Sequence, residues 1–230
     1  MLELRDVSVR RGGWALWADL SVAPGALVAV IGPSGAGKST LLSAIGGFED
    51  VSGAILWNGA RIDALSPARR PCATLFQDGN LFPHLSGRRN VALGLRPNLR
   101  LSDAEWARVD AALADAGLED FAGRLPGDLS GGQAARVALA RVAVQDRPLL
   151  LLDEAFGGLG PALKREMLER TAALAKADGR TLLMITHDPD DAAAICPETM
   201  LVADGLVHPP APTVALLADP PPALAAYLGR

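Results

Sequence analysis

The chain has 230 residues, of which 50% are hydrophobic, and a formal net charge of −4 at pH 7. A chain of this length can bury a large core in one α/β domain, so it needs no disulfide or metal staple. The acidic balance and the lack of a basic run argue against nucleic acid as a partner, and two widely spaced cysteines indicate a reducing compartment.

Targeting and membrane segments are not expected. The N-terminus lacks the basic segment and apolar core of a signal peptide, and no apolar run reaches the roughly 18 residues that a membrane-spanning helix needs. We therefore expect a cytosolic protein, whose membrane role would depend on a partner.

The first third of the chain is rich in short segments that predict strands. Residues 2–9 alternate apolar and polar side chains, which is typical of a half-buried strand. Continuous apolar runs bounded by glycine, proline or asparagine predict fully or partly buried strands. These further strands are expected at 20–22, 26–31, 54–57 and 72–77.

The segment 32–40, which we call the phosphate loop, reads GPSGAGKST and fits the pattern G-x-x-x-x-G-K-[ST]. A predicted strand precedes this loop and a helical pattern follows it, as the phosphate-binding motif requires. This context disfavours the alternative that the segment is only a glycine-rich turn before an ordinary helix. Its glycines let backbone N–H groups approach a phosphate, and the helix N-terminus adds partial positive charge. Lys38 is expected to bridge the β- and γ-phosphates, and the Ser39 hydroxyl to hold Mg²⁺.

All residues of the phosphate loop are predicted to bind the nucleotide. They are Gly32, Pro33, Ser34, Gly35, Ala36, Gly37, Lys38, Ser39 and Thr40.

From residue 86 to about 145 the pattern becomes mostly helical. Ser102 and Glu105 have the spacing of a capping box, and the helix behind them is expected to run to Gly117. Further along, residues 129–133 read LSGGQ, and we call them the signature segment. Its serine is expected to cap the next helix, and its two glycines leave that helix's N–H groups open to an anion.

The C-terminal part alternates apolar runs with helical patterns. Strands are predicted at 149–152, 181–186 and 200–202, and an amphipathic helix at 161–176. Continuous apolar strands separated by helices imply a parallel sheet that is covered on both faces. The prolines between residues 209 and 222 predict an irregular tail.

Three candidate chemical groups follow predicted parallel strands, and ligands of such sheets bind at the carboxyl ends of the strands. They are the phosphate loop, the acidic pair Asp153-Glu154, and His187. Asp153 is expected to hold Mg²⁺, and Glu154 to polarise the water that attacks the γ-phosphate. Alone, an acidic pair after a strand is usually a solvated helix start, but the phosphate loop favours the catalytic interpretation.

Together, the phosphate loop, the signature segment and the acidic pair resemble the ATPases of ATP-binding-cassette (ABC) transporters over nearly the whole chain. The resemblance implies an α/β fold, that of a P-loop NTPase of ABC type. Its core is a mostly parallel sheet, with an antiparallel β part at the N-terminus and an inserted helical subdomain. We predict one ABC ATPase domain over 1–230, in which 1–85 and 146–230 form the core and 86–145 the helical subdomain.

The resemblance also implies roles for individual residues. Gln77 matches the Q-loop glutamine, which contacts Mg²⁺ and links the metal site to the membrane partner, and His187 matches the switch histidine on the γ-phosphate. In this family two copies of the chain sandwich two ATP molecules, each bound between one phosphate loop and the other copy's signature. The expected contacts of that signature are Ser130, Gly131, Gly132 and Gln133.

Within the family, residues 66–71, 75–85 and 94–99 are similar to the ATP-binding subunit of bacterial thiamine importers. This likeness implies a subunit at the cytoplasmic face of the bacterial inner membrane, held there by integral permease subunits. A periplasmic solute-binding protein would act on it indirectly. Two alternatives remain open: an importer ATPase for iron, sulfate or a polyamine, and a weakly active nucleotide-binding regulator.

Four positions depart from the family pattern. Arg11 stands where importers carry an aromatic residue that stacks on adenine, so either its guanidinium or Trp14 is expected to stack. Gly160 replaces the D-loop aspartate, and residues 134–135 are alanines in place of a polar or basic pair. We expect these departures to affect catalytic efficiency and dimer communication more than nucleotide binding.

Overall fold

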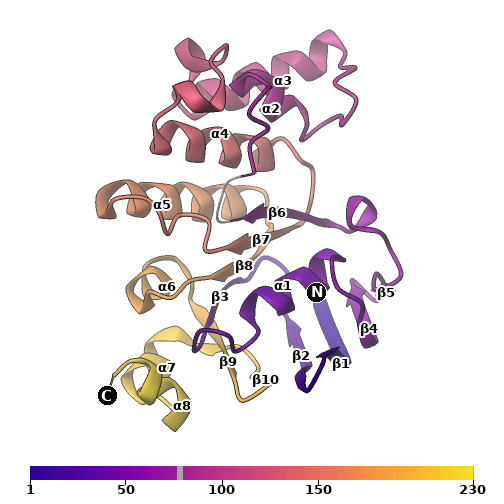
Figure 1. Cartoon of the computed structure of the whole chain (residues 1–230), viewed down its shortest axis with the longest axis vertical. Helices are drawn as coiled ribbons and strands as arrows, with labels where there is room; N and C mark the ends of the chain where they lie inside the picture. The colour runs from indigo at the N-terminus through magenta and orange to yellow at the C-terminus, as the bar shows by residue number, and fades with distance from the viewer. Residues whose placement is uncertain (77–79, 230) are drawn as a thin grey trace.

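The computed structural model describes residues 1–76 and 80–229. Among these residues, one sheet of eleven strands, in the order β5-β4-β1-β2-β10-β9-β3-β8-β7-β6 with β11 beside β9, runs through the molecule (Figure 1). The helices of the middle of the chain form a separate layer at the top of Figure 1, and α7 and α8 lie at the opposite end.

The centre of the sheet is parallel and buried. Its strands are β3 (Leu27–Ile31), β6 (Cys72–Phe76), β7 (Leu149–Asp153), β8 (Thr181–Ile185) and β9 (Glu198–Ala203). Neighbours in the order β9-β3-β8-β7-β6 are all parallel. Every residue of β3 and β8 is buried, because other elements cover both faces. The predicted parallel core is therefore confirmed.

Successive residues of β3 face two different cores, as the pleat of a strand requires. Ala29 and Ile31 pack with residues of the helices α4, α5, α6 and α8. Val28 and Val30 pack with α1 and with the antiparallel strands on the other side. These helices are α1 (Lys38–Gly46), α4 (Gly131–Ala143), α5 (Pro161–Ala177), α6 (Pro189–Ile195) and α8 (Pro222–Tyr227).

The N-terminal part of the sheet is antiparallel, as predicted, through the pairs β1–β2, β1–β4 and β4–β5. These strands are β1 (Leu2–Arg11), β2 (Trp14–Val22), β4 (Ser52–Trp57) and β5 (Ala60–Arg61). The short β10 (Leu206–Val207) joins this part to β9. The strand expected at 20–22 is longer than predicted, because it pairs with β1 along its whole length.

The middle of the chain forms a helical layer with its own apolar core. Its helices are α2 (Gly87–Ala92), α3 (Asp103–Asp115) and α4. Val109, Leu113 and Val137 are buried together there, apart from the two cores of the sheet. The capping box predicted from Ser102 is present, and α3 ends two residues before Gly117, which has a φ of 65°. Among the described residues, no helix is long and apolar enough to cross a membrane.

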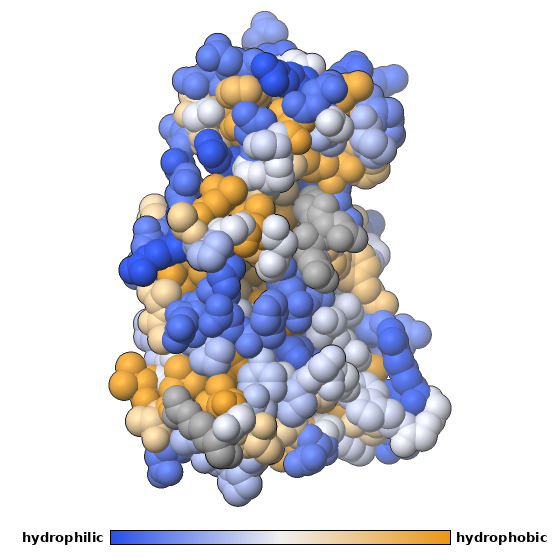
Figure 2. All heavy atoms as spheres, turned by 60° about the vertical axis from the view of Figure 1, so that its left-hand side comes forward, coloured by the Kyte–Doolittle hydropathy of each residue, from blue (hydrophilic) through white to orange (hydrophobic). Residues whose placement is uncertain are grey.

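The prediction of an irregular tail was wrong. After β11 (Ala211–Pro212), the chain forms α7 (Thr213–Ala218) and α8. Pro212, Pro221 and Pro222 lie at the starts of these helices, where a missing N–H group costs nothing and the fixed φ suits the first turn. Figure 2 shows apolar residues exposed near this end of the molecule, and Val214 in α7 is 79% exposed.

A buried arginine joins the end of α1 to the segment before β6. Arg70 is only 1% exposed. Its guanidinium donates hydrogen bonds of 3.0, 3.2 and 2.8 Å to the backbone carbonyl oxygens of Leu65, Ile45 and Asp63. Burial lowers the pKa of Arg70 below its ordinary value, so the three carbonyl dipoles are what solvates this cation in place of water.

We expect Arg70→Met to lower the free energy of unfolding by about 3 kcal/mol or more. The substitution leaves the buried carbonyl group of Ile45 and the partly buried carbonyl groups of Leu65 and Asp63 without this donor, and each such group costs about 1–3 kcal/mol. Urea unfolding measures the loss. The neighbouring Arg69 is exposed, so Arg69→Met is a matched control and should change stability by less than about 0.5 kcal/mol. Equal losses in both variants would contradict this role of Arg70.

Candidate functional site

The phosphate loop leaves β3 in a backbone conformation that requires glycine at two positions. Gly32 has a φ of 147°, and a Cβ there would lie 2.0 Å from the carbonyl oxygen of Val202. Gly37 has a φ of 106°, and a Cβ there would lie 2.7 Å from the Trp14 ring. The glycines at these points therefore allow both the left-handed turn and the close packing of the loop against β9 and β2.

Lys38, the first residue of α1, lies inside this loop and is 8% exposed. Its Nζ donates hydrogen bonds of 2.9 Å to the carbonyl oxygens of Gly32 and Pro33. Burial lowers the pKa of Lys38, although the carboxylates of Glu154 and Asp153 act in the opposite direction. A partly desolvated ammonium group at the mouth of a helix N-terminus forms a site for phosphate groups.

Ser39 and Asp153 meet at the ends of α1 and β7. The Ser39 hydroxyl donates a hydrogen bond of 3.0 Å to Asp153 Oδ1. Burial raises the pKa of Asp153, and the nearby Glu154 carboxylate adds to the shift, while the Ser39 hydrogen bond opposes it. The described residues contain no group of three or more histidines, cysteines or acids that could hold a metal ion. A hydroxyl and a carboxylate alone fit Mg²⁺, whose other ligands in nucleotide sites are phosphate oxygens and water.

Glu154 has a left-handed backbone, with a φ of 47°. Its N–H group donates to the carbonyl oxygen of Ile185 (3.3 Å), and its own carbonyl accepts from the N–H group of Gly157 (3.0 Å). A non-glycine residue in this region costs about 1–2 kcal/mol, and the surrounding hydrogen bonds hold it there. As a result the adjacent carboxylates have different neighbours: Asp153 meets Ser39, whereas Glu154 turns toward the end of β8.

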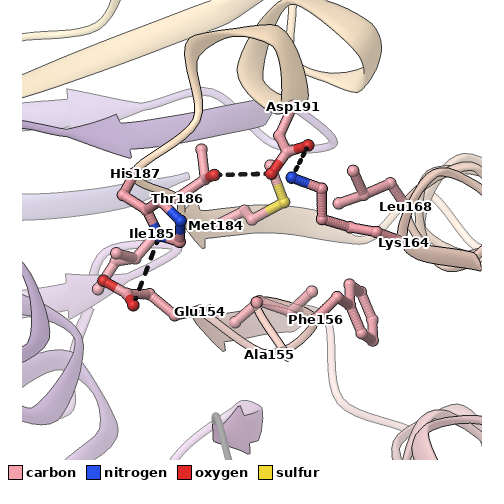
Figure 3. Close-up of a pocket in the computed structure, with 12 residues that line it drawn as sticks. Glu154, Ala155, Phe156, Lys164, Leu168, Met184, Ile185, Thr186, His187 and Asp191 are labelled. Carbon is pink, nitrogen blue, oxygen red and sulfur yellow. Dashed lines mark hydrogen bonds and ion pairs between the residues drawn. The ribbon is translucent and has the colours of Figure 1, made fainter. Parts of the chain in front are cut away.

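His187 lies opposite Glu154, with its Nδ1 atom 3.6 Å from Glu154 Oε2 (Figure 3). The residues around it, 186–188, form what we call the histidine loop. Thr186 Oγ1 donates a hydrogen bond of 2.9 Å to Asp191 Oδ2. Lys164 of α5 pairs with Asp188 at 2.7 Å and with Asp191 at 2.9 Å. The histidine loop is thus fastened to both α5 and α6.

The supporting residues of the histidine loop were not predicted from the sequence. Asp188 and Asp191 stand three positions apart across the start of α6, which places them on one face and is the only local signal. Nothing local indicates Lys164 as their partner, because it belongs to the preceding helix. Such contacts form only when the fold brings distant segments together.

A cavity of about 340 Å³ lies between the phosphate loop and β2. Arg11 at the end of β1 and Trp14 at the start of β2 line it on the side of the antiparallel strands. The Trp14 ring packs on Gly37, whereas Arg11 is 61% exposed and forms an ion pair with Glu49. The other lining residues are Ser34, Gly35, Gly37, Lys38, Ser39, Thr40 and Glu154.

The signature segment begins α4 and lies outside this cavity. The Ser130 Oγ atom accepts from the Gln133 N–H group (3.3 Å), and the Gln133 side chain accepts from the Ser130 N–H group (2.9 Å). This confirms the predicted cap on the helix. The two signature glycines, Gly131 and Gly132, form the first turn of α4. A Cβ at Gly132 would lie 2.4 Å from the Leu163 side chain. Gln77 lies outside the described residues.

Comparison with known proteins agrees with this arrangement. Residues 17–157 match the ABC transporter family. The chain is 53% identical to the thiamine import ATP-binding protein ThiQ of Ruegeria sp. (strain TM1040) and 52% identical to ThiQ of Cereibacter sphaeroides, with 100% of every chain covered. Among solved structures, the dimeric ATP-binding cassette MJ0796 bound to ADP and Pi superposes with a TM-score of 0.79 and 28% identity. This match covers 93% of this chain and 99% of that one.

The chain therefore belongs to the ABC transporter family and is an ATPase domain of that family. The α/β fold predicted from the motifs is confirmed by the likeness to ABC cassettes.

We expect Trp14→Ala to weaken ATP binding by about five-fold to one-hundred-fold, because stacking of a base on an aromatic ring contributes about 1–3 kcal/mol. Trp14→Phe keeps a ring and should lose less. Calorimetric titration with ATP measures both. Trp17 lies on the same strand, is 45% exposed and carries the Arg10 guanidinium over its ring. Trp17→Ala is thus the matched control, and unchanged affinity is expected for it. If Trp14→Ala bound ATP with the affinity of the wild-type protein, the adenine base would stack on Arg11 instead of Trp14.

Proposed function

We propose that this chain is the ATP-binding and ATP-hydrolysing subunit of a bacterial thiamine importer. The observation that carries the catalytic part is the meeting of the Ser39–Asp153 pair and the Glu154–His187 pair beside the buried Lys38. The solute is supported by identities of 53% and 52% over the full chain to two proteins named for thiamine import.

Each group has a role that follows from its chemistry. Lys38 binds the β- and γ-phosphates, and the N–H groups of residues 32–40 surround them. Ser39, Asp153 and Gln77 hold Mg²⁺, which neutralises phosphate charge when it is bound. Glu154 orients the attacking water and accepts its proton, and His187 contacts the γ-phosphate. Glu154 is available for this role because its carboxylate lies beside His187 and lines the cavity next to the phosphate loop, whereas Asp153 accepts the hydrogen bond from Ser39.

A second copy of the chain completes the site. The phosphate loop lines the cavity, whereas the signature segment, residues 129–133, does not. In the proposed homodimer, the signature of one copy closes the ATP bound by the other. MJ0796, which is similar in fold, forms a dimer. We further propose the division into a core of 1–85 and 146–230 and a helical subdomain of 86–145.

The importer has other components in this proposal. Integral permease subunits hold the dimer at the cytoplasmic face of the inner membrane, and a periplasmic solute-binding protein delivers the solute to them. The ATPase subunit itself does not contact the solute, so its own cavities do not determine which one is carried. Transport specificity therefore needs a test on the whole system.

We expect Glu154→Gln to keep ATP bound and to lower ATP hydrolysis at least about one-hundred-fold, because the amide cannot accept a proton. The enzyme is assayed as the complex with its permease subunits, and ATP-bound dimers are measured by size-exclusion chromatography. Lys38→Ala is the control that loses ATP binding as well. Normal turnover by Glu154→Gln would show that Glu154 is not the general base. A wild-type complex that does not hydrolyse ATP would favour the alternative of a weakly active nucleotide-binding regulator.

The solute is tested in cells that lack the gene. Uptake of radiolabelled thiamine should fall to background and return with the plasmid-borne wild-type gene, but not with Glu154→Gln. Uptake of iron, sulfate and spermidine is measured in the same cells for comparison. Loss of one of these instead of thiamine would transfer the proposal to that solute.

Gly160 lies at the N-cap of α5 and has extended backbone angles (φ −63°, ψ 154°). No side chain caps this helix, and a Cβ at Gly160 would meet nothing within 4 Å. An aspartate therefore fits this position without strain and suits the N-cap chemically. Lack of space therefore does not explain why glycine stands here in place of the family's aspartate.

We expect Gly160→Asp to stabilise the fold by a few tenths of a kcal/mol and to raise the ATP-dependent dimer fraction of the Glu154→Gln protein. The ordered cap reduces the backbone freedom that dimer closure must otherwise remove. Sedimentation velocity with ATP measures the fraction. Gly158 also has open space around it, so Gly158→Asp adds the same charge away from the cap as a control. Equal dimer fractions in the two aspartate variants would refute the role of residue 160.

A further inference from the structure

The last helix of the chain contacts the histidine loop directly. The Tyr227 hydroxyl, at the end of α8, donates a hydrogen bond of 2.7 Å to the backbone carbonyl oxygen of His187. The bond joins residues that are 40 positions apart. It acts on the backbone of the histidine and leaves the imidazole ring free to face Glu154.

Buried contacts fix the position of α8. Leu224 is fully buried in the core formed by α4, α5 and α6, and Tyr227 packs against the same core. The two residues are three positions apart, so they share one face of the helix. The Leu224 N–H group donates a hydrogen bond of 2.8 Å to the carbonyl oxygen of Pro221, where the helix begins. The tail thus holds Tyr227 at a defined place beside the histidine loop, which follows the carboxyl end of β8.

The surroundings of the Tyr227 hydroxyl favour its protonated form. Burial raises the pKa of Tyr227, and the carboxylates of Glu154 and Asp188 raise it further. The group therefore remains a hydrogen-bond donor.

Thr186 and Lys164 also fasten the histidine loop. The Asp188 N–H group donates a hydrogen bond of 3.0 Å to Thr186 Oγ1, and Lys164 pairs with Asp188. These contacts fix the residues before and after His187. The Asp188 N–H group and the His187 carbonyl belong to one peptide group, so the Thr186 and Tyr227 hydrogen bonds hold that group from its two ends. Together they fix the peptide plane that follows the His187 Cα atom, which limits how the His187 side chain can be oriented.

We propose that Tyr227 is a positioning residue for ATP hydrolysis, which sets the orientation of His187 beside Glu154 through the His187 carbonyl group. The inference rests on the proposed function, since it assumes that His187 and Glu154 act on ATP. It adds a role for the C-terminal tail, which belongs to none of the motifs. In this role α8 is a fixed support of the site rather than only a cover for the core.

The decisive variant is Tyr227→Phe, which keeps the ring and removes only the hydroxyl. Its kcat for ATP in the complex with the permease should fall about five-fold, the size expected for one neutral hydrogen bond. Its KM for ATP should change by less than about two-fold, because the phosphate loop and Trp14 are untouched. An unchanged kcat, with active wild-type protein, would overturn the inference and leave the proposed function standing.

Thr213→Val is the matched control for tail stability. The Thr213 hydroxyl, which is buried in α7, donates a hydrogen bond of 2.6 Å to the carbonyl oxygen of Cys196, away from the histidine loop. The variant should lower the unfolding midpoint in urea but leave kcat within about two-fold. If it lowered kcat as much as Tyr227→Phe does, general weakening of the tail would explain both losses, and the inference would fail.

A double-mutant comparison tests whether Tyr227 acts through His187. In a His187→Ala background, adding the Tyr227→Phe substitution should leave the single-turnover rate unchanged, because there is no imidazole left to orient. A further loss of about five-fold in that background would overturn the inference. If the wild-type complex did not hydrolyse ATP, the proposed function would be contradicted, and this inference with it. That outcome differs from the others, in which the wild-type complex is active.

Discussion

The register of three parallel strands determines where the chemistry of this protein takes place. Ile185 of β8 is paired with Val30 of β3 on one side and with Asp153 of β7 on the other. The phosphate loop, Glu154 and His187 each begin within two residues of these paired positions. Because the side-chain direction alternates along a strand, a slip of one residue in either pairing would turn the reacting groups to opposite faces of the sheet. The hydrophobic burial that fixes the register therefore also assembles the site.

The sequence predicts those features whose signal is local. The buried strands are continuous apolar runs, and the caps at Ser102 and Ser130 follow a three-residue spacing, so both are found correctly. The phosphate loop, the acidic pair and His187 are likewise visible, because each is a short motif beside a predicted strand. The length of β2 was underestimated, since its first part is only partly buried and depends on pairing with β1. The tail was mispredicted because its prolines start helices rather than prevent them.

The supports of the site are hidden in the sequence for a physical reason. Arg70 is bonded to a carbonyl of α1 that lies 25 residues away, and Tyr227 to one that lies 40 residues away. When no motif surrounds an arginine or tyrosine, the sequence does not show whether its side chain is solvated or donates a hydrogen bond to a buried carbonyl group. The different neighbours of the two adjacent acids are hidden as well, because the left-handed conformation of Glu154 depends on hydrogen bonds with Ile185 and Gly157.

The N-terminal turn of α5 connects the two layers of the molecule at the site. Leu163 fills the space left by the absent Cβ of Gly132 in the signature segment, which joins α5 to the helical layer. The next residue, Lys164, pairs with Asp188 and Asp191 around the histidine loop. Packing at this density does not deform continuously. A shift of the signature segment relative to the core must therefore either break the contact with Leu163 or move the start of α5, and with it the ion pairs that hold His187 opposite Glu154.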